Sequence, residues 1–410
     1  MGLREQLEAL GLRRGTAGLS RPARRAPGVE ALIAGEVAGT PRGECFVVTE
    51  THAPEHVHGA GPVSALWEQQ PASLARLAGD ERFAAVELTR TAFLDIETTG
   101  LAGGTGTYAF LVGLGWFEPD RSFVVRQWFM RDYGEEPAQM LLLAEALSRF
   151  EAIVGFNSKA FDLPLLQTRL ALSRLPCDLY GAPHLDLLFP ARRLWSGMLP
   201  SCALSCLEPY VLDVRRSEDV PGYIIPSLYF DYLRTGDARP LLAVFAHNRQ
   251  DILSLVTLAA RLCRALERPL EASTPAEMLG LARIYEDAGL ADESRLLYNA
   301  ALRGPLPAPH AHRAARRLSA LYKRAGQRAD AAALWQSMLQ RGEQPPLEAY
   351  IELAKHYEWV ERDYAGALRV AEEAGRLVAG WPPGPQRRRA ADEIAHRLQR
   401  LRRKAAEKER

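Results

Sequence analysis

The chain has 410 residues, of which 47% are hydrophobic and 25% charged, and this composition and length predict a globular protein of about two to three domains. Its net charge of +1 excludes a protein that is basic throughout, so any attraction for a polyanion must be local. No run of roughly 18 apolar residues is present, which excludes a membrane-spanning helix. Five cysteines without paired spacing favour a reducing cytoplasm over a disulfide-stabilised secreted fold.

The N-terminal segment, residues 1–42, is predicted to be a short helix followed by a loosely ordered stretch rich in Arg, Pro and Gly. Arginines interrupt what would have to be the apolar core of a secretory signal, which excludes that interpretation. The arginines of this segment either touch a phosphate backbone or belong to a solvated tail, and we favour the solvated tail.

In the region that follows, the hydrophobic period changes in a consistent order. Gly-rich and Pro-Asp turns separate the first three apolar runs, which favours antiparallel strands. An amphipathic helix then leads into another buried strand. The predicted elements are strands over 92–94, 108–116 and 123–129, a helix over 136–150 and a strand over 153–157.

Two carboxylates, Asp95 and Glu97, stand two residues apart at the end of the first apolar run. On a strand, residues i and i+2 project from the same face, so the two side chains would lie together. Like charges at this spacing repel each other unless a cation lies between them, and divalent metals prefer such hard oxygen ligands. Taken alone, the pair also fits an ordinary exposed strand end.

Three later residues belong with this pair. Asp162 follows the strand at 153–157, at its junction with a predicted helix. His247 and Asp251 are four residues apart in a helical pattern and therefore share one face. The candidate catalytic set thus contains four carboxylates and one histidine.

The order of these motifs resembles the DEDD superfamily of 3'-to-5' exonucleases, whose catalytic domain has the ribonuclease H fold. The resemblance rests on Asp95-x-Glu97, on Asn157 to Asp162 and on His247 ahead of Asp251. Within that superfamily, the chain resembles the YprB-type ribonuclease H-like proteins over roughly residues 45–265. The segments that carry this closer resemblance are 99–106, 184–188, 192–195, 199–205 and 219–222.

This resemblance implies an α/β fold over residues 43–268, in which a ribonuclease H-like mixed sheet is flanked by helices. The first and fourth strands of such a sheet are neighbours, so the resemblance brings the acids together. Four carboxylates in one small site repel each other, and two Mg²⁺ or Mn²⁺ ions about 3.5–4 Å apart would relieve that repulsion.

The resemblance also assigns roles. Asp95 would bridge both ions, Glu97 and Asp251 would complete the first metal site, and Asp162 would help to hold the second. His247 would orient or deprotonate the attacking water. Its spacing from Asp251 is the one that a tyrosine usually has in this superfamily, so the choice between base and positioning donor stays open.

Four further residues are candidates for substrate contacts. Thr98 and Thr99 lie where the turn after the first strand would meet the terminal nucleotide. Asn157 and Lys159 flank the second motif, and Asn157 also fits a cap at the strand end. Asp186 either supports the site from behind or caps the next helix.

The last third is different. Similar segments begin at 281, 318 and 353, a period of about 35 residues that resembles tetratricopeptide repeats. We therefore expect an all-α repeat domain over 269–384, with an irregular helical bundle as the alternative. Such repeats offer a concave surface for a protein or peptide partner. Residues 385–410 read as a basic helix, either solvated or able to guide a polyanion.

The predicted function is a metal-dependent 3'-to-5' exonuclease that acts on the 3' end of DNA or RNA in the cytoplasm. One alternative is a catalytically idle adaptor that binds nucleic acid or, through its repeats, protein. Another is a structure-selective endonuclease, because the same sheet and metals serve both reactions. The sequence does not choose between DNA and RNA or between single and double strands, and it does not name the partner or the oligomeric state.

Overall fold

The computed structural model describes residues 26–100, 106–216, 219–271, 274–341 and 345–408, and these divide into two compact units. The first unit comprises the described residues up to Pro71, together with Arg82–Leu187 and Glu208–Ala259. The second comprises Ala72–Glu81, Leu188–Leu207 and the described residues from Ala260 onward. Among the described residues, no helix has both the length and the apolarity that crossing a membrane requires.

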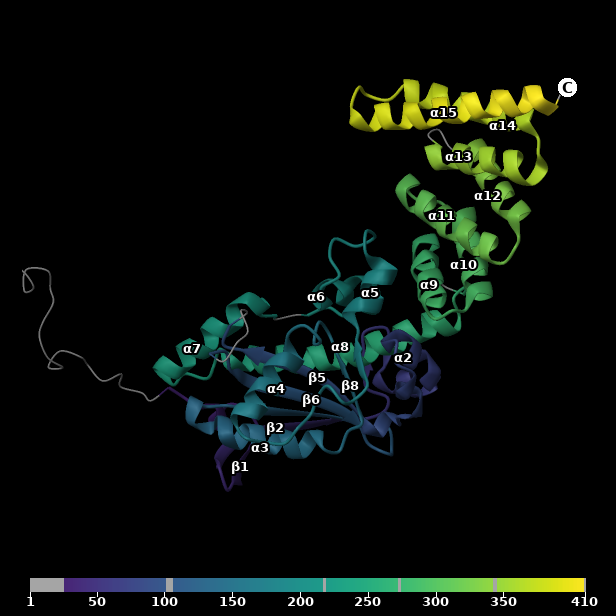
Figure 1. The fold of residues 1–410 in the computed structure, drawn as a ribbon. Coiled ribbons are helices and arrows are strands. Elements are labelled where there is room, and N and C mark those ends of the chain that lie inside the picture. Colours follow the sequence, from purple (N-terminus) through teal and green to yellow (C-terminus); the bar gives the residue numbers. More distant parts are fainter. Residues whose placement is uncertain (1–25, 101–105, 217–218, 272–273, 342–344, 409–410) are drawn as a thin grey trace, which may run out of the picture. The chain divides into compact units, whose positions relative to one another are not determined.

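The first unit is built on a mixed sheet of seven strands in the order β1-β2-β7-β6-β5-β8-β9 (Figure 1). β5 pairs antiparallel with β6 and parallel with β8, so the predicted first and fourth strands are neighbours. This confirms the predicted fold class. The strands are β1 (Glu36–Thr40), β2 (Gly43–His52), β5 (Thr91–Thr98), β6 (Ala109–Phe117), β7 (Phe123–Phe129), β8 (Ala152–Gly155) and β9 (His184–Asp186), beside a separate pair, β3 (Val57–His58) and β4 (Gly61–Pro62).

The first two strands of this sheet, β1 and β2, are not among the elements predicted from the sequence. β1 lies inside the segment 1–42 that was expected to be loosely ordered, and it pairs antiparallel with β2. β2 in turn pairs with β7, which extends the sheet on that side. β1 is short and mostly exposed, so its apolar pattern is too weak to identify it as a strand. The predicted helix at the start of this segment lies outside the described residues.

Helices cover both faces of the sheet. α3 (Glu136–Leu147) and α4 (Asp162–Leu172) pack on the face that carries Leu94 and Ile96. α7 (Ile225–Thr235) and the first part of α8 (Leu241–Glu267) pack on the other face, around Phe110, Phe129 and Tyr229. Every residue of β6 is buried, because this central strand has a helix layer on each side.

Two glycines of β6 allow α8 to approach the sheet closely. A Cβ atom on Gly113 would lie 2.3 Å from Oδ1 of Asn248 and 2.5 Å from Cδ1 of Ile252. A Cβ atom on Gly115 would lie 2.5 Å from Cγ2 of Ile252. Gly113 is also the partner of Asp95 in the β5–β6 register. The absence of side chains at these positions therefore lets α8 cross directly over the strand that carries the acids.

The second unit is entirely helical, as predicted for the C-terminal region (Figure 1). Successive helices pack in pairs, α9 with α10, α11 with α12 and α13 with α14, and α15 packs on α14. Its helices are α2 (Pro71–Ala78), α5 (Leu188–Trp195), α6 (Leu204–Leu207), α9 (Pro275–Asp287), α10 (Ala291–Arg303), α11 (Ala308–Arg324), α12 (Arg328–Arg341), α13 (Leu347–His356), α14 (Tyr364–Ala379) and α15 (Pro385–Lys408).

Two of these helices, α5 and α9, are tied together by buried contacts. Thr274 and Glu277 form a reciprocal capping box at the start of α9. Glu277 also accepts a hydrogen bond from Nε1 of Trp195 at 2.8 Å and pairs with Arg261 at 3.1 Å. A Cβ atom on Gly280 would lie 2.4 Å from the main-chain oxygen of Arg193, so α5 and α9 are in backbone contact. α5 thus depends on α9 for the burial of its tryptophan.

Candidate active site

Strand β5 presents Asp95 and Glu97 on one face, as the alternation of a strand requires. Their neighbours Leu94 and Ile96 are buried in the core on the opposite face. The acids face α8, because Nδ2 of Asn248 on that helix donates to Oδ2 of Asp95 at 2.7 Å and to its main-chain oxygen at 3.1 Å. The predicted pair is therefore directed at the helix that carries His247 and Asp251.

The orientation of Asn248 is fixed by a second amide. Nε2 of Gln127, on β7, donates to Oδ1 of Asn248 at 2.8 Å and to the main-chain oxygen of Phe245 at 2.9 Å. This leaves Nδ2 of Asn248 to face Asp95. Neither amide is among the residues predicted from the sequence. The available signals were the polar Gln127 within the mostly apolar β7 and the position of Asn248 directly after His247.

Asp162 is the first residue of α4 and is buried. Burial, and secondarily the charge of Asp186, raises the pKa of the Asp162 carboxyl to about 7. Asp186, at the end of β9, accepts hydrogen bonds from the main-chain amides of Asn157 at 2.8 Å and Lys159 at 3.1 Å. Asn157 has a left-handed φ of 59°, so Asp186 holds the tight turn that leads into α4.

All four acids lie in one site, because the charges of Asp251 and Asp162 add to the effect of burial in raising the pKa values of Asp95 and Glu97. Burial raises the pKa of Asp95 well above its usual range, and the charges of Asp251, Glu97 and Asp162 raise it further. Glu97 behaves in the same way: burial is the main cause, followed by Asp251 and Asp162, while Arg216 opposes the shift. The carboxylates are thus close enough to repel each other strongly in the absence of a cation.

His247 lies between these acids and Asp219. Its Nδ1 is 2.7 Å from Oδ1 of Asp219, and its Nε2 is 3.6 Å from Oδ2 of Asp251 and 3.9 Å from Oε1 of Glu97. Burial opposes ionisation of Asp219, but the hydrogen bond from His247 and the charge of Arg216 outweigh it and lower its pKa. Asp219 therefore orients the imidazole so that Nε2 faces the acids.

Arg216, which is not among the residues predicted from the sequence, is the central cation of this site. Nε and Nη2 of Arg216 donate to Glu208 at 2.6 and 2.7 Å, Nη1 donates to Asp219 at 3.2 Å, and Nη2 donates to Asp251. Glu208 is buried and also accepts from Oγ of Ser254 at 2.6 Å. Glu208 begins a short helical turn, Glu208–Leu212, and Arg216 lies in the coil after it, so no hydrophobic period identifies either residue.

The donor set has the chemistry of a divalent-cation site. Among the described residues, no group of three or more His, Cys, Asp or Glu side chains has the arrangement of a formed metal site. Asp251, one member of the set, is hydrogen-bonded to Arg216 instead. The four acids nevertheless supply only hard carboxylate oxygens, and their mutual repulsion would be relieved by Mg²⁺ or Mn²⁺.

The threonines after β5 support the local turn. Oγ1 of Thr98 donates to the main-chain oxygen of Gly100 at 2.9 Å, and Oγ1 of Thr99 accepts from the amide of Tyr108 at 3.0 Å. Thr98 is buried, while Thr99 is partly exposed. Most of the Gly-rich stretch that follows, 101–105, lies outside the described residues.

Comparison with known proteins assigns the family. The model of the RNase H superfamily matches residues 92–263. The uncharacterized protein YprB of Bacillus subtilis (strain 168) is 34% identical over 293 residues, which is 69% of this chain and 68% of that protein. An RNase H-like domain supports hydrolysis of nucleic acid in general, and nucleases of this superfamily use divalent metal ions. The chain therefore belongs to the YprB family, with a domain of the RNase H superfamily over residues 92–263.

Proposed function

We propose that this protein is a metal-dependent 3'-to-5' exonuclease that hydrolyses phosphodiester bonds of DNA or RNA. The convergence of four mutually repelling carboxylates, Asp95, Glu97, Asp162 and Asp251, is the observation that supports this best. A fold that only binds nucleic acid gains nothing from four acids whose repulsion destabilises it and repels phosphates. The catalytically idle adaptor is therefore the less favoured alternative.

Asp95, Glu97 and Asp251 would hold one Mg²⁺ or Mn²⁺ ion, and Asp95 and Asp162 the second. When bound, such ions lower the pKa of a water molecule and stabilise the charge that develops on the leaving 3' oxygen. Asn248 keeps the Asp95 carboxylate in place through its 2.7 Å hydrogen bond. Asp186 does the same for Asp162 indirectly, since it fixes the turn that leads into α4.

His247 would handle the proton of the attacking water. Its Nδ1 lies 2.7 Å from the Asp219 carboxylate and 2.9 Å from Nη1 of Arg216. Because Nη1 of Arg216 also donates to Asp219, at 3.2 Å, we assign the proton of the neutral imidazole to Nδ1, where it is directed at the Asp219 carboxylate. Nε2 then has a free lone pair on the side of Glu97 and Asp251, where a general base is needed. Arg216 supplies a fixed positive charge next to Asp251, where it also suits a phosphate oxygen.

We propose that four further residues of the same site contact or position the substrate. Lys159 is exposed on a turn whose amides are held by Asp186, so its ammonium group is free to meet a phosphate. Asn157, beside it, has an exposed side chain in a fixed backbone conformation. Thr98 and Thr99 would act through the turn that their hydroxyl groups stabilise.

The test is a cleavage assay with 5'-labelled single-stranded and duplex DNA and RNA in Mg²⁺, Mn²⁺ or EDTA. An exonuclease produces a ladder that shortens progressively from the 3' end in the presence of metal and no products in EDTA. Cleavage of a circular single strand would instead identify an endonuclease. Binding without cleavage in either metal would favour the idle adaptor and contradict the proposal.

We further propose that the helices from 269 to 384 are tetratricopeptide-like repeats that offer a surface to a protein or peptide, with the nuclease domain over 43–268 and a basic helix over 385–410. The consecutive pairing of α9 to α14 supports this. Because Trp195 on α5 bonds to Glu277 on α9, a chain ending at Arg268 should be less stable than one ending at Arg303, after α10. Equal stability of the two truncated chains would show that α5 does not need the first repeat.

A further inference from the structure

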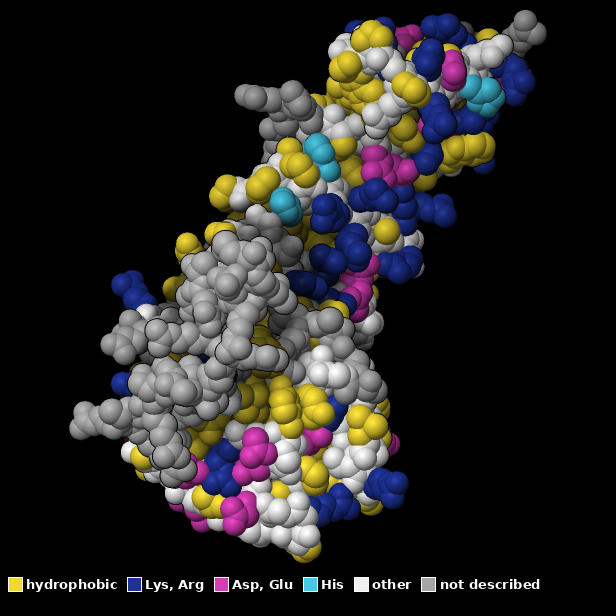
Figure 2. All heavy atoms as spheres, turned by 90° about the vertical axis from the view of Figure 1, so that its left-hand side faces the viewer, with side chains coloured by type: hydrophobic (Ala, Val, Ile, Leu, Met, Phe, Trp, Pro, Cys, Tyr) yellow, Lys and Arg dark blue, Asp and Glu magenta, His cyan; other side chains and the backbone are white. Residues whose placement is uncertain are grey.

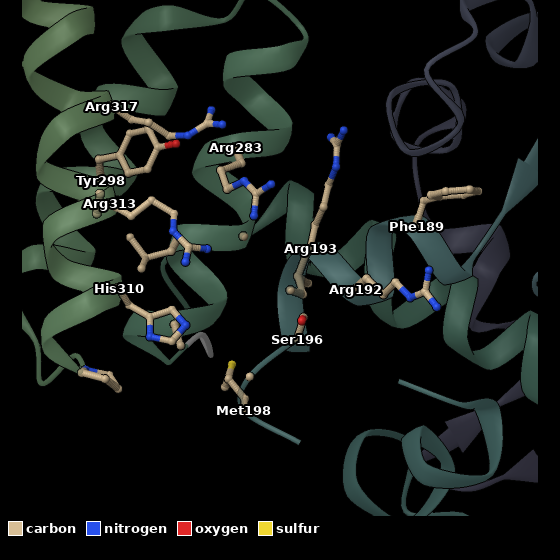
Figure 3. A pocket seen from close by; sticks show the side chains of 17 residues that line it. Phe189, Arg192, Arg193, Ser196, Met198, Arg283, Tyr298, His310, Arg313 and Arg317 are labelled. Atoms are coloured by element: carbon tan, nitrogen blue, oxygen red, sulfur yellow. The ribbon is translucent and has the colours of Figure 1, made fainter. Parts of the chain in front are cut away.

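A pocket of about 540 Å³ lies within the helical unit and is not explained by the proposed chemistry (Figure 3). α5 and the loop after it form one wall, and α9, α10 and α11 form the other. Figure 3 shows arginine side chains entering this space from both walls. The basic residues that line it are Arg192, Arg193, Arg283, Arg313, Arg317 and His310.

The charge of this pocket is only partly balanced. No Asp or Glu is among its described lining residues. Arg193 pairs with Asp287 at 2.7 Å, and Arg317 pairs with Glu286 at 2.9 Å. The other three arginines, Arg192, Arg283 and Arg313, have no carboxylate within salt-bridge distance among the described residues. Like charges gathered in this way repel each other, so the pocket favours an anionic occupant.

The arginines stand on a fixed framework. The backbones of α5 and α9 touch at Gly280, and the hydrogen bond from Trp195 to Glu277 locks the two helices together. Arg193 on α5 and Arg283 on α9 therefore line the same space without any rearrangement, while Arg192 is directed toward the side of Phe189 (Figure 3). A binding site arranged in advance loses less conformational entropy when its ligand arrives.

His310 adds an unsatisfied polar atom to the same pocket. Its Nδ1 is buried and has no hydrogen-bond partner among the described residues. The ring lies against Gly197, where a Cβ atom would be 3.4 Å from Nε2. Gly197 has a φ of +84°, which a residue with a side chain rarely adopts. A buried donor or acceptor without a partner costs free energy, and a polar ligand would supply that partner.

Apolar side chains provide the rest of the lining. Phe189 and Met198 are 51% and 38% exposed, although both are large and hydrophobic. Leu194, Leu279 and Ala314 form buried parts of the walls. A purely ionic ligand such as free phosphate leaves such a surface unused. A flat aromatic base joined to a phosphate matches both parts, because bases stack on apolar and guanidinium surfaces and phosphates bind arginine forks.

We propose that this pocket binds a nucleotide unit of single-stranded nucleic acid, with its phosphate on Arg283 and Arg313 and its base against Met198 and the apolar wall of Leu279 and Ala314. The proposal rests on the proposed nuclease function and adds a second nucleic-acid contact, on the helical unit. Basic side chains also gather over this unit in the upper part of Figure 2. A free nucleotide offers the same chemistry, so the experiment separates the two sources.

The C-terminal helix, which was the predicted basic element, is a poorer candidate. Arg400 and Lys404 both bond to the buried carboxylate of Glu358, at 2.7 and 2.9 Å. Arg397 is itself buried against α14. These charges are already used to attach α15, whereas those of Arg283 and Arg313 are not. Arg388 and Arg389 remain exposed on α15 and provide a matched control.

The test measures binding of the full chain to fluorescent ten-nucleotide oligo-dT and oligo-U in EDTA, so that no cleavage is required. Arg283→Ala with Arg313→Ala should weaken binding about 100-fold, because each lost charge-assisted contact is worth about tenfold. It should also lower the dependence of log Kd on log salt by about two phosphate contacts. Arg388→Ala with Arg389→Ala removes the same charge and should change Kd less than about twofold. Equal losses in both double variants would show general attraction and overturn the proposal.

Competitors identify the ligand. Displacement of the oligonucleotide by thymidine monophosphate from the wild type, but not from the pocket variant, supports the nucleotide site. The Kd of thymidine monophosphate relative to that of oligo-dT shows whether a free nucleotide or a nucleotide unit of a strand binds better. Displacement by poly-glutamate at equal charge would contradict it and indicate an acidic protein partner. If the Arg283/Arg313 variant unfolds at a lower temperature than wild type, Arg192→Ala, at an exposed position, replaces it.

Different results would contradict the nuclease proposal and the pocket proposal. Oligonucleotide binding that depends on Arg283 and Arg313, in a protein that cleaves nothing with Mn²⁺, would remove the nuclease assignment and leave the pocket assignment standing. If the protein cleaves with metal but its oligonucleotide Kd is the same with and without these arginines, the nuclease assignment stands and the pocket assignment is contradicted.

Discussion

Each unit of this protein contains a cluster of like charges, acidic in the first unit and basic in the helical unit. The repulsion within the two clusters is reduced in different ways. In the first unit, built on the seven-stranded sheet, Asp162 is buried and Asp95 and Glu97 are partly buried beside it, and Arg216 offsets part of their charge through Asp251. In the helical unit, arginines surround an open pocket, and water rather than an opposite charge screens most of them. The net charge of +1, the balance of 51 basic and 50 acidic residues over the whole chain, gives no indication of either cluster.

This difference indicates what each site is built to bind. Buried like charges cost much more free energy than exposed ones, so the acidic site favours the binding of a small cation between its carboxylates. Half-exposed arginines cost little until a ligand covers them, which suits a polyanion that binds and leaves repeatedly. Glycine serves both sites in the same way. Gly113 lets α8 approach the acids, and Gly280 lets α9 approach the arginines of α5.

The largest effect is expected at Asp95. Asp95→Asn should reduce metal-dependent cleavage below detection, because this carboxylate faces every other acid of the set. It should also raise the melting temperature in EDTA, since the pKa of Asp95 is raised by burial and like charges and the ionised form therefore destabilises the fold. That gain should be present at pH 8 and vanish near pH 4, where the wild-type carboxyl is protonated.

The matched control is Asp231→Asn, an exposed residue of α7 that removes one charge away from the site. It should change neither cleavage nor melting temperature appreciably. Cleavage by the Asp95→Asn protein at a rate close to wild type would exclude the assigned catalytic set, whatever its stability.

The next effect concerns His247. His247→Ala should lower the cleavage rate by about 100- to 10,000-fold, the usual contribution of general acid or base assistance. Its folding should change much less, because the side chain is only partly buried. His247→Tyr should retain some activity, since a phenol suits this spacing from Asp251. Rate measurements across pH at saturating metal would check the role, and a loss of less than about threefold on His247→Ala would make the residue structural.

The buried cation of the acidic site is tested by Arg216→Gln. This change leaves Glu208 buried without its partner and should cost about 3–5 kcal/mol of unfolding free energy at pH 8. Burial already raises the pKa of Glu208, and Arg216 opposes that shift. The penalty should therefore shrink as pH falls and Glu208 takes up a proton. Urea unfolding in EDTA at pH 8 and pH 5 measures it.

The compensating variant is Arg216→Gln combined with Glu208→Gln, which removes both charges. Most of the lost stability should return, because a paired amide network replaces an isolated charge. If the double variant is as unstable as Arg216→Gln alone, the contribution of Arg216 comes from packing rather than from its charge.

Sequence patterns predicted the parts of this molecule that depend on local period. The strands around Asp95, the helix at 136–147 and the helical C-terminal region are all set by neighbouring residues, so their apolar spacing identifies them. β1 was missed because an edge strand with one exposed valine has no such spacing.

The candidate site divides in the same way. Asp95 and Glu97 are two apart on a strand and His247 and Asp251 are four apart on a helix, so each pair is visible locally. Asn248 contacts Asp95, which is 153 residues away in the chain, and Arg216 contacts Asp251, which is 35 residues away, so neither contact follows from a local period. The arginine pocket was missed for the same reason, since α5 and α9 to α11 contribute to it from separate segments.

The smallest predicted effect tests whether close approach is what gathers the acids. Gly113→Ala places a methyl group within 2.5 Å of Asn248 and Ile252, so α8 must move away from β6. Overpacking of this kind costs about 1–3 kcal/mol. Asn248 would then lose its hold on Asp95, and cleavage should fall together with stability. Gly39→Ala on β1, where a Cβ atom meets nothing within 4 Å, is the matched control and should leave both unchanged. Oligonucleotide binding in EDTA should be the same in all three proteins, because the arginine pocket belongs to the other unit; a weaker Kd in Gly113→Ala alone would show that the acidic site and the pocket do not act independently.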